Sequence, residues 1–210
     1  MIPAFPVYVF DVDGTLTDSQ VDICGAIQTV LAAHGRTDVS REFLRRYIGR
    51  HLLEEFLDLG FPAEEIDQMI AEYRAIYSAR GHSGTVVYPG VAEALARLGG
   101  RKSTATTKGT PTTRLVLEQF GLIQHFDHVQ GTDGFPAKPA PDVLLKSLEV
   151  LHVRPEDCLF VGDSAADMES GRRAGIRTCA VTWGYGEPDE MARWEPDFWI
   201  HAPHELLPDY

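Results

Sequence analysis

The amino-acid sequence predicts a three-layer α/β protein: a mostly parallel sheet between two layers of helices, interrupted by an all-helical insertion. Two observations lead to this prediction. Short apolar runs alternate with helical patterns over most of the chain, and strands separated by helices imply crossover connections in a parallel sheet that is covered on both faces. Residues 19–82 differ, because apolar residues recur there three and four apart with no convincing strand between them.

The predicted strands are short apolar runs that end at turn residues or carboxylates. They are expected at residues 7–10, in a polar stretch that ends near Thr106, and at 128–130, 158–162, 178–182 and 198–200. The stretch before Thr106 is unusually polar for a central strand. Ligands of such sheets bind beyond the carboxyl ends of the strands. Asp11, Thr106 and Asp163 each follow a predicted strand, so we expect them in one crevice.

The insertion is expected to be built from successive helices. Their patterns cover residues 21–33, 41–48, 51–59 and 63–77. The alternation of strands and helices resumes near residue 87, where Pro89 suits a helix start and Gly99 with Gly100 a helix end. The predicted units are therefore a core of residues 1–18 and 83–210 and a helical insertion of residues 19–82.

Composition and charge restrict the class of partner. The chain has 210 residues, of which 44% are hydrophobic and 24% charged, as in a soluble globular protein. A net charge of −12 argues against nucleic acid and anionic membranes as partners and favours small molecules. The three cysteines are far apart and lack metal-site spacing, and the first apolar run meets Asp11 too soon for a signal peptide or a membrane span. We therefore expect a cytoplasmic protein.

The first candidate motif is D11-V-D-G-T15, at the end of the first predicted strand. Asp11 and Asp13 would repel each other in a site of low dielectric constant unless a positive charge lay between them. A calcium loop of the EF-hand type needs glycine at its sixth position, which is Leu16 here. A plain turn remains the alternative, but it leaves the second acidic motif unexplained.

The second acidic motif is G162-D-S-A-A-D167. Ser164 is a plausible helix N-cap and Gly175 a plausible helix end. Asp163 and Asp167 are four residues apart and are expected to face the same crevice. Asp167 has an alternative role, a favourable negative charge near a helix N-terminus, which needs no ligand.

Hydroxyl and ammonium groups accompany the carboxylates. Thr106 and Thr107 follow a strand, where hydroxyls and backbone N–H groups suit a phosphoryl group, although Thr107 is at least as well explained as a turn cap. Lys138 lies in a proline-rich loop, where a lysine is usually a solvated surface residue. Beside four carboxylates, however, one ammonium and one divalent cation would compensate the charge. Ligands that are all oxygen favour Mg²⁺ over zinc.

These motifs, in this order, carry a resemblance to a known family. D11-V-D-G-T15, Thr106, Lys138-Pro139 and G162-D-S-A-A-D167 resemble the haloacid dehalogenase superfamily of phosphohydrolases. With a helical insertion directly after the first motif, the chain is most similar to the phosphoglycolate phosphatase-like branch. The resemblance covers nearly the whole chain and implies a Rossmann-like core whose helical insertion is a cap that closes over the crevice.

The resemblance implies a role for each motif residue. Asp11 is the expected nucleophile, which forms an aspartyl-phosphate, and Asp13 the expected general acid and base. Mg²⁺ is expected on the Asp11 carboxylate, the Asp13 backbone carbonyl and Asp163, with Asp167 binding it through water or supporting the other ligands. The phosphoryl oxygens are expected to be bound by Thr106, Lys138 and the backbone N–H groups near Asp13, Gly14 and Thr107.

In the insertion, Arg50 and His51 directly follow a flexible glycine and are candidates for binding a substrate carboxylate or second phosphate. The alternative for these basic residues is a solvated helix face. Asp18 is expected to be a hinge or capping residue at the start of the insertion. For Tyr185, which follows a strand, packing within its loop is favoured over a place at the crevice.

The function predicted from these residues is Mg²⁺-dependent hydrolysis of a small phosphate ester, phosphoglycolate-like or a sugar phosphate. Within the family, the presence of Asp13 favours hydrolysis of phosphate esters over cleavage of carbon–halogen or carbon–phosphorus bonds. A sugar phosphomutase remains an alternative function. A phospho-aspartate signalling receiver and an inactive binding relative are the alternatives from other classes. A receiver fits less well, because its phosphorylated aspartate follows the acid pair on a later strand. The choice of ester and the oligomeric state stay open.

Overall fold

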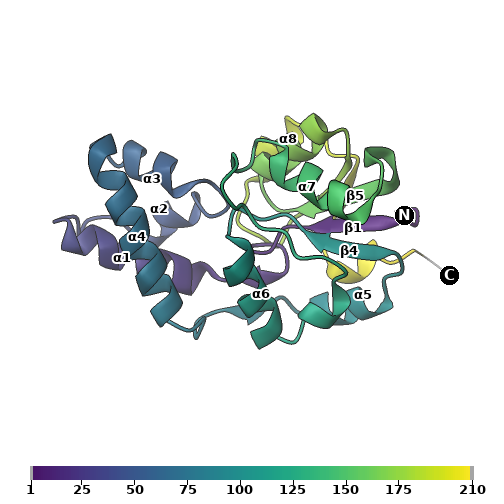
Figure 1. The fold of residues 1–210 in the computed structure, drawn as a ribbon, viewed down its shortest axis with the longest axis horizontal. Coiled ribbons are helices and arrows are strands. Elements are labelled where there is room, and N and C mark those ends of the chain that lie inside the picture. The colour runs from purple at the N-terminus through teal and green to yellow at the C-terminus, as the bar shows by residue number, and fades with distance from the viewer. Residues whose placement is uncertain (1, 209–210) are drawn as a thin grey trace.

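In the computed structural model, which describes residues 2–208, a parallel sheet with strand order β4-β1-β5-β6-β7 forms the centre of the protein (Figure 1). Its strands are β1 (Val7–Phe10), β4 (Arg101–Thr104), β5 (Cys158–Gly162), β6 (Arg177–Val181) and β7 (Phe198–Ile200). All four neighbouring pairs are parallel. The predicted α/β class is therefore confirmed.

The strand predicted at residues 128–130 is wrong. This segment runs along the outer edge of β4 without a regular backbone ladder: the His128 N–H donates to the Lys102 carbonyl oxygen over 3.2 Å, and the remaining contacts use the Thr104 side chain. The Thr104 hydroxyl donates to the Gln130 carbonyl oxygen over 2.9 Å, and the Gln130 N–H donates to the same hydroxyl over 2.8 Å. The edge position of β4 also explains its polar sequence, which is unusual only for a central strand.

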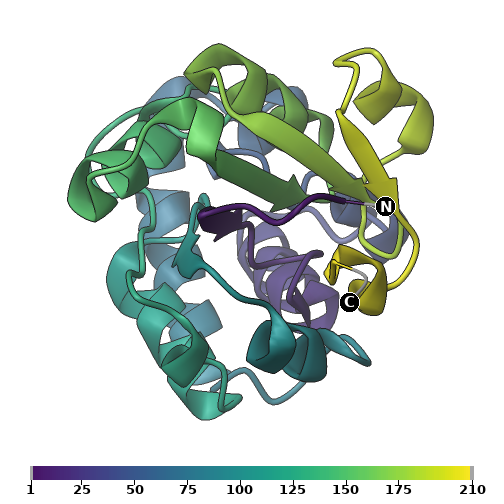
Figure 2. The same ribbon diagram turned by 90° about the vertical axis from the view of Figure 1, so that its right-hand side faces the viewer.

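Alternate residues of each strand face opposite sides of the sheet and build two apolar layers. The helices of this part of the chain are α5 (Val91–Arg97), α6 (Thr110–Gln119), α7 (Asp142–Leu151), α8 (Ala165–Ala174) and α9 (Pro188–Ala192). Tyr8 and Phe10 pack with residues of α5 and α6, whereas Val7 and Val9 pack with residues of α7 and α8. Figure 2 shows these two helical layers on either side of the sheet.

A helical insertion, which runs from residue 20 at the start of its first helix to residue 79 at the end of its last, lies beyond one end of the sheet (Figure 1). It contains α1 (Gln20–Ala33), α2 (Arg41–Arg45), α3 (Leu52–Asp58) and α4 (Ala63–Ala79). It has an apolar cluster of its own, which includes Ile27, Leu31, Leu44, Phe56 and Met69. The second helix is shorter than predicted, since residues 46–49 form turns and Gly49 has a φ of 92°.

The two chain segments that join the insertion to the core lie side by side. A short antiparallel pair, β2 (Thr17–Asp18) with β3 (Val86–Val87), connects them and was not predicted. Just beyond it, the buried Asp22 carboxylate accepts hydrogen bonds from the Thr85 hydroxyl over 2.8 Å and the Gly84 N–H over 2.9 Å. The start and the end of the insertion are thus tied to each other, which fixes where the helices meet the core.

Among the described residues, no helix has both the length and the apolar character that a membrane span requires.

Candidate active site

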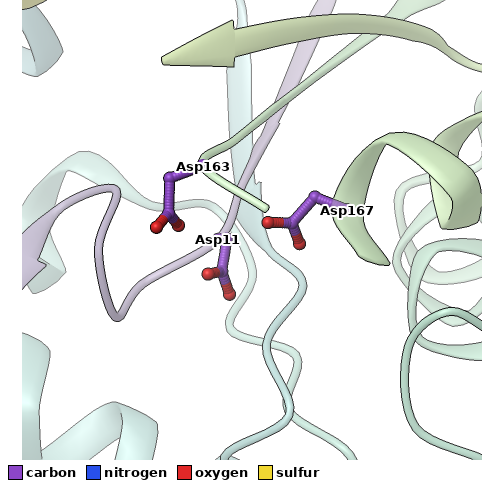
Figure 3. Close-up of side chains that lie close together, drawn as sticks. All are labelled: Asp11, Asp163 and Asp167. Carbon is purple, nitrogen blue, oxygen red and sulfur yellow. The ribbon is translucent and has the colours of Figure 1, made fainter. Parts of the chain in front are cut away.

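Three carboxylates converge at the carboxyl end of the sheet. Asp11 follows β1, Asp163 follows β5 and Asp167 lies in the first turn of α8. Their side chains point toward one another (Figure 3), and one oxygen of each lies within 4.8 Å of the others. All three residues are buried, with at most 3% of their surface exposed. Asp11 and Asp163 therefore lie together at this edge of the sheet, as their positions after the strands predict, and Asp167 joins them.

The start of α8 holds Asp167 in place. Ser164 and Asp167 form a capping box, in which the Asp167 N–H donates to the Ser164 hydroxyl and the Ser164 N–H donates to Asp167 Oδ2 over 3.0 Å. Gly162 lets this turn approach the strand, because a Cβ there would lie 2.6 Å from the Asp167 side chain. Both roles considered for Asp167 are thus present: it caps the helix and faces the carboxylate cluster.

Lys138 is buried against these carboxylates, with 2% of its surface exposed. Its Nζ lies 2.8 Å from Asp11 Oδ1 and 2.5 Å from Asp167 Oδ1. Burial by itself would lower the pKa of the ammonium group, but the two carboxylates outweigh it and raise that pKa. Lys138 is therefore no solvated loop residue; it is a fixed positive charge between two acids.

One ammonium does not neutralise the cluster. Burial raises the pKa of Asp11 to about 7 although Lys138 lowers it, and burial with repulsion from Asp167 and Asp11 raises the pKa of Asp163 well above its ordinary value. The donor groups are all carboxylate oxygens, which suit hard divalent cations. The buried cluster of Asp11, Asp163 and Asp167 therefore fits a divalent metal site.

Asp13 is held by two residues that the sequence did not single out. The Ser19 hydroxyl donates to Asp13 Oδ1 over 2.6 Å, and Lys108 Nζ lies 3.2 Å from Oδ2. Lys108 also donates to the Tyr77 hydroxyl over 2.8 Å, so it joins Asp13 in the core to α4 in the insertion. Its position after Thr106 and Thr107 was the one available signal for Lys108.

Asp163 is oriented by neighbours from two further loops. The Thr15 hydroxyl donates to Oδ1 over 3.0 Å, and the Tyr185 backbone N–H donates to Oδ2 over 2.8 Å. Gly14 has a φ of 93°, and a Cβ at this position would overlap the Asp163 carboxylate. The first motif therefore needs glycine to bring its loop against Asp163.

Tyr185 lies at the crevice, so the favoured packing within its own loop is wrong. Its hydroxyl donates to Asp18 Oδ1 over 2.9 Å and accepts from the Ser19 N–H over 2.7 Å. The same residue thereby contacts the Asp163 carboxylate with its backbone and the start of the insertion with its side chain. Asp18 takes no part in the carboxylate cluster and lies at this junction, and its role as a hinge or capping residue stays a prediction.

Comparison with known proteins agrees with this geometry. Residues 8–181 match the family of haloacid dehalogenase-like hydrolases. The chain belongs to this family. It is 34% identical over 212 residues to the phosphoglycolate phosphatase of Aquifex aeolicus, covering 96% of this chain and 94% of that protein. It is 35% identical over 199 residues to the tyrosine-protein kinase PtkA of Mycobacterium tuberculosis, covering 92% of this chain and 68% of that protein.

A solved haloacid dehalogenase-like hydrolase from Streptococcus pneumoniae superposes with a TM-score of 0.90 at 27% identity, covering 96% of each chain. The resemblance drawn from the sequence motifs is therefore confirmed. So is the enzyme class, a phosphatase of the haloacid dehalogenase type.

Two predicted phosphate-binding groups of this haloacid dehalogenase-like hydrolase differ in their surroundings. Thr106 is buried near the end of β4, and its hydroxyl accepts from the Lys108 N–H over 3.3 Å, which leaves its own proton to donate. The Gly14 N–H already donates to the Thr17 carbonyl oxygen over 2.8 Å. In this conformation Gly14 thus serves the shape of the loop, and its amide is not free for a phosphoryl oxygen.

A cavity of about 680 Å³ lies between the helical insertion and the core of this hydrolase. Thr107, Arg50 and His51 all line it, together with Asp13 and Lys108. The Arg50 guanidinium lies 5.6 Å from the centre of the Tyr47 ring and 3.8 Å from Glu190 Oε2. His51 caps α3, its Nδ1 accepting from the Leu53 N–H over 3.2 Å. Substrate contact by Arg50 and His51 stays a prediction.

Proposed function

We propose that this protein is a Mg²⁺-dependent phosphatase that hydrolyses a small phosphate ester through an aspartyl-phosphate on Asp11. The observation that carries the proposal is the buried cluster of Asp11, Asp163 and Asp167 with Lys138 held against it. Family membership and phosphoglycolate phosphatases among the relatives support the same reaction class. The substrate we expect is phosphoglycolate-like or a sugar phosphate.

Asp11 is suited to act as the nucleophile. Lys138 binds its Oδ1, whereas none of the described residues donates a hydrogen bond to Oδ2. In the first step Oδ2 attacks phosphorus and the bond to the leaving oxygen breaks, with Asp13 donating a proton to that oxygen. In the second step Asp13 takes a proton from a water molecule that attacks the phosphorus, which releases phosphate and restores the Asp11 carboxylate.

Asp11, Asp163 and Asp167 would hold the metal, with the Asp13 carbonyl as a further oxygen donor. When bound, Mg²⁺ supplies positive charge opposite the oxygens of the transferred phosphoryl group. Lys138 supplies a second positive charge on the Asp11 side, and Thr106 a hydroxyl. We further propose that residues 19–82 act as a cap over a core of residues 1–18 and 83–210, with Lys108 and Tyr77 in contact when the cap is closed.

A phosphate-release screen over small phosphate esters tests the function, with Mg²⁺ present and then with a chelator. We expect turnover with Mg²⁺, loss of turnover on chelation and recovery when Mg²⁺ is added back in excess. Turnover that persists unchanged in the chelator would remove the metal from the mechanism. Failure of every ester to release phosphate, while the protein is folded and saturated with Mg²⁺, would contradict the phosphatase assignment.

Replacement of Ser19 by alanine tests the positioning of Asp13. Ser19 is the N-cap residue of α1, but its hydroxyl makes no capping hydrogen bond and donates to Asp13 instead. Loss of one hydrogen bond to a charged group should therefore lower kcat by about tenfold, with little change in KM. Steady-state kinetics of S19A measure both constants, and S83A, at an exposed serine, is the matched control. An unchanged kcat would show that Asp13 does not depend on Ser19.

A further inference from the structure

One buried acid of the helical insertion has no partner. Glu55 lies on α3 with only 2% of its surface exposed, and its Oε1 makes no hydrogen bond among the described residues. No described lysine, arginine or histidine forms an ion pair with it. Isolated buried carboxylates are rare in folded proteins, because the group loses its hydration without gaining a replacement.

Glu55 lines the cavity between the insertion and the core. Asp13 lines the same cavity from the core, so the unpartnered carboxyl group and the proposed acid and base face one shared cavity. At about 680 Å³, the cavity falls within the range usual for sites that bind small organic molecules. A leaving group that reaches Asp13 would enter this cavity, which α3 also lines.

The surroundings of Glu55 disfavour a purely structural role. Its immediate neighbour Phe56 and nearby Ile70 belong to the apolar cluster of the insertion, where a leucine at position 55 would pack without a desolvation cost. Burial raises the pKa of Glu55 to about 8, so the folded protein holds this acid protonated while the unfolded chain ionises it, and the stability of the fold falls as the pH rises from 4.5 toward 8. A residue that costs stability at a cavity wall is a candidate for ligand binding.

Several other polar groups of the cavity already have partners or face solvent. Lys108 contacts Asp13 and Tyr77, and His51 caps α3. Arg50 and Arg74 are both exposed. Among the described side chains that line this cavity, Glu55 is the one with a buried polar atom that lacks a hydrogen-bond partner.

We propose that Glu55 determines substrate specificity by accepting a hydrogen bond from a hydroxyl or ammonium group on the leaving group of the phosphate ester. The inference rests on the proposed phosphatase function and narrows its substrate class. Above its pKa of about 8 Glu55 is ionised, and a leaving group that presents a carboxylate to it is then disfavoured, because two negative charges would meet in the cavity. Esters of polyols, sugars or amino sugars are therefore favoured over esters of hydroxy acids such as phosphoglycolate.

A matched set of esters tests the proposal. Glucitol 6-phosphate carries a hydroxyl group, glucosamine 6-phosphate an ammonium group and 6-phosphogluconate a carboxylate, and phosphoglycolate is a short acidic ester. At pH 9, where Glu55 is ionised, we expect kcat/KM of the unaltered protein to be at least about tenfold higher for the hydroxyl or the ammonium ester than for either carboxylate. Whichever of the hydroxyl and ammonium esters has the higher kcat/KM identifies the group that donates to Glu55. Equal or higher kcat/KM for the carboxylates would overturn the proposal.

Two variants separate specificity from stability. Glu55→Gln keeps an acceptor oxygen but removes the charge, so the preference over the carboxylates should fall by about tenfold while the hydroxyl ester is still used. Glu55→Leu removes the acceptor and should raise KM for the preferred ester by about tenfold. Glu64→Gln, at an exposed position on α4, makes the same chemical change outside the cavity and should alter neither quantity.

The outcomes distinguish the two proposals. If the unaltered protein hydrolyses none of these esters and forms no phosphoenzyme, the phosphatase function fails and the role of Glu55 fails with it. If the esters are hydrolysed but both Glu55 variants keep the original ratios of kcat/KM, the role of Glu55 alone is overturned. Should Glu55→Leu not fold, the isosteric Glu55→Gln still decides the question.

Discussion

Replacement of Asp11 by asparagine is expected to abolish phosphate release. The amide has almost the shape of the carboxylate but is a poor nucleophile, so the step that forms the aspartyl-phosphate is lost. Removal of the nucleophile from other enzymes that form covalent intermediates suggests a loss on the order of 10³-fold or more in kcat. The fold should remain, because Lys138 keeps Asp167 as a partner and one of three mutually repelling carboxylates is removed. Phosphate-release kinetics and thermal melting measure the two expectations.

A labelling experiment assigns the loss to Asp11 itself. Protein incubated with a radiolabelled ester and quenched in acid should carry label on the peptide that contains Asp11, and the Asp11→Asn variant should carry none. Asp67→Asn, at an exposed position of α4, is the matched control and should label and turn over normally. Label on any other aspartate, or normal turnover of the Asp11 variant, would contradict the mechanism. Label that passes to a sugar phosphate instead of water would identify a phosphomutase.

The carboxylate cluster was predictable because it depends on sheet topology. Asp11 and Asp163 each come directly after a strand, and neighbouring parallel strands end at the same edge. Asp167 needs only one turn of helix after Asp163 to reach the same place. The burial of Lys138 follows less directly. Its loop has no regular structure. The position of Lys138 among the acids was predicted only from the negative charge of the other motif residues.

The contacts of Asp13 could not be predicted in the same way. Lys108 reaches Asp13 and Tyr77 at once, and Tyr77 lies on a helix whose position over the core is set by tertiary packing. Tyr185 contacts Asp163 through its backbone N–H, and any non-proline residue has such a group. Side-chain identity therefore carried no signal for the Tyr185 contact.

The wrong strand prediction at residues 128–130 and the unpredicted role of Glu55 both arise because tertiary contacts cannot be read from a local pattern. Residues 128–130 follow the edge of β4 through the Thr104 hydroxyl, so the local apolar pattern was correct about position but not about backbone pairing. Glu55 lies three residues after Leu52 and four before Leu59, which places it on the inner side of α3. The periodicity that predicted this helix thus also placed an acid on its buried face, although whether that acid has a partner depends on the tertiary structure.

Replacement of Lys138 by methionine is expected to cause the largest loss of stability. The substitution keeps the length of the side chain but leaves Asp11 and Asp167 without their ion pair, at a site where Lys138 has 2% of its surface exposed. Removing one partner of a buried pair typically costs about 3–5 kcal/mol of unfolding free energy. Urea denaturation at pH 8 in a chelator measures this cost. Lys146→Met, which removes an exposed lysine paired with Glu149, should change stability by less than about 1 kcal/mol.

The pH dependence of the stability lost in Lys138→Met shows whether the charge of Lys138 is the cause. The pKa of Lys138 is raised above its ordinary value, so the lysine stays charged throughout the neutral range and its own contribution is lost only at high pH. The acids titrate instead: the pKa of Asp11 is about 7 with Lys138 present, and loss of the ammonium raises it further. The destabilisation should therefore be large at pH 8 and shrink toward pH 5.5, where protonated acids need no cation. Mg²⁺ should restore part of the stability of Lys138→Met at pH 8 if it binds the same carboxylates. The kcat of this variant should stay about 10²–10³-fold below that of the unaltered protein, because the charge that Lys138 places beside the phosphoryl group is absent. A loss that is equal at both pH values would mean that Lys138 stabilises the protein by packing and not by its charge.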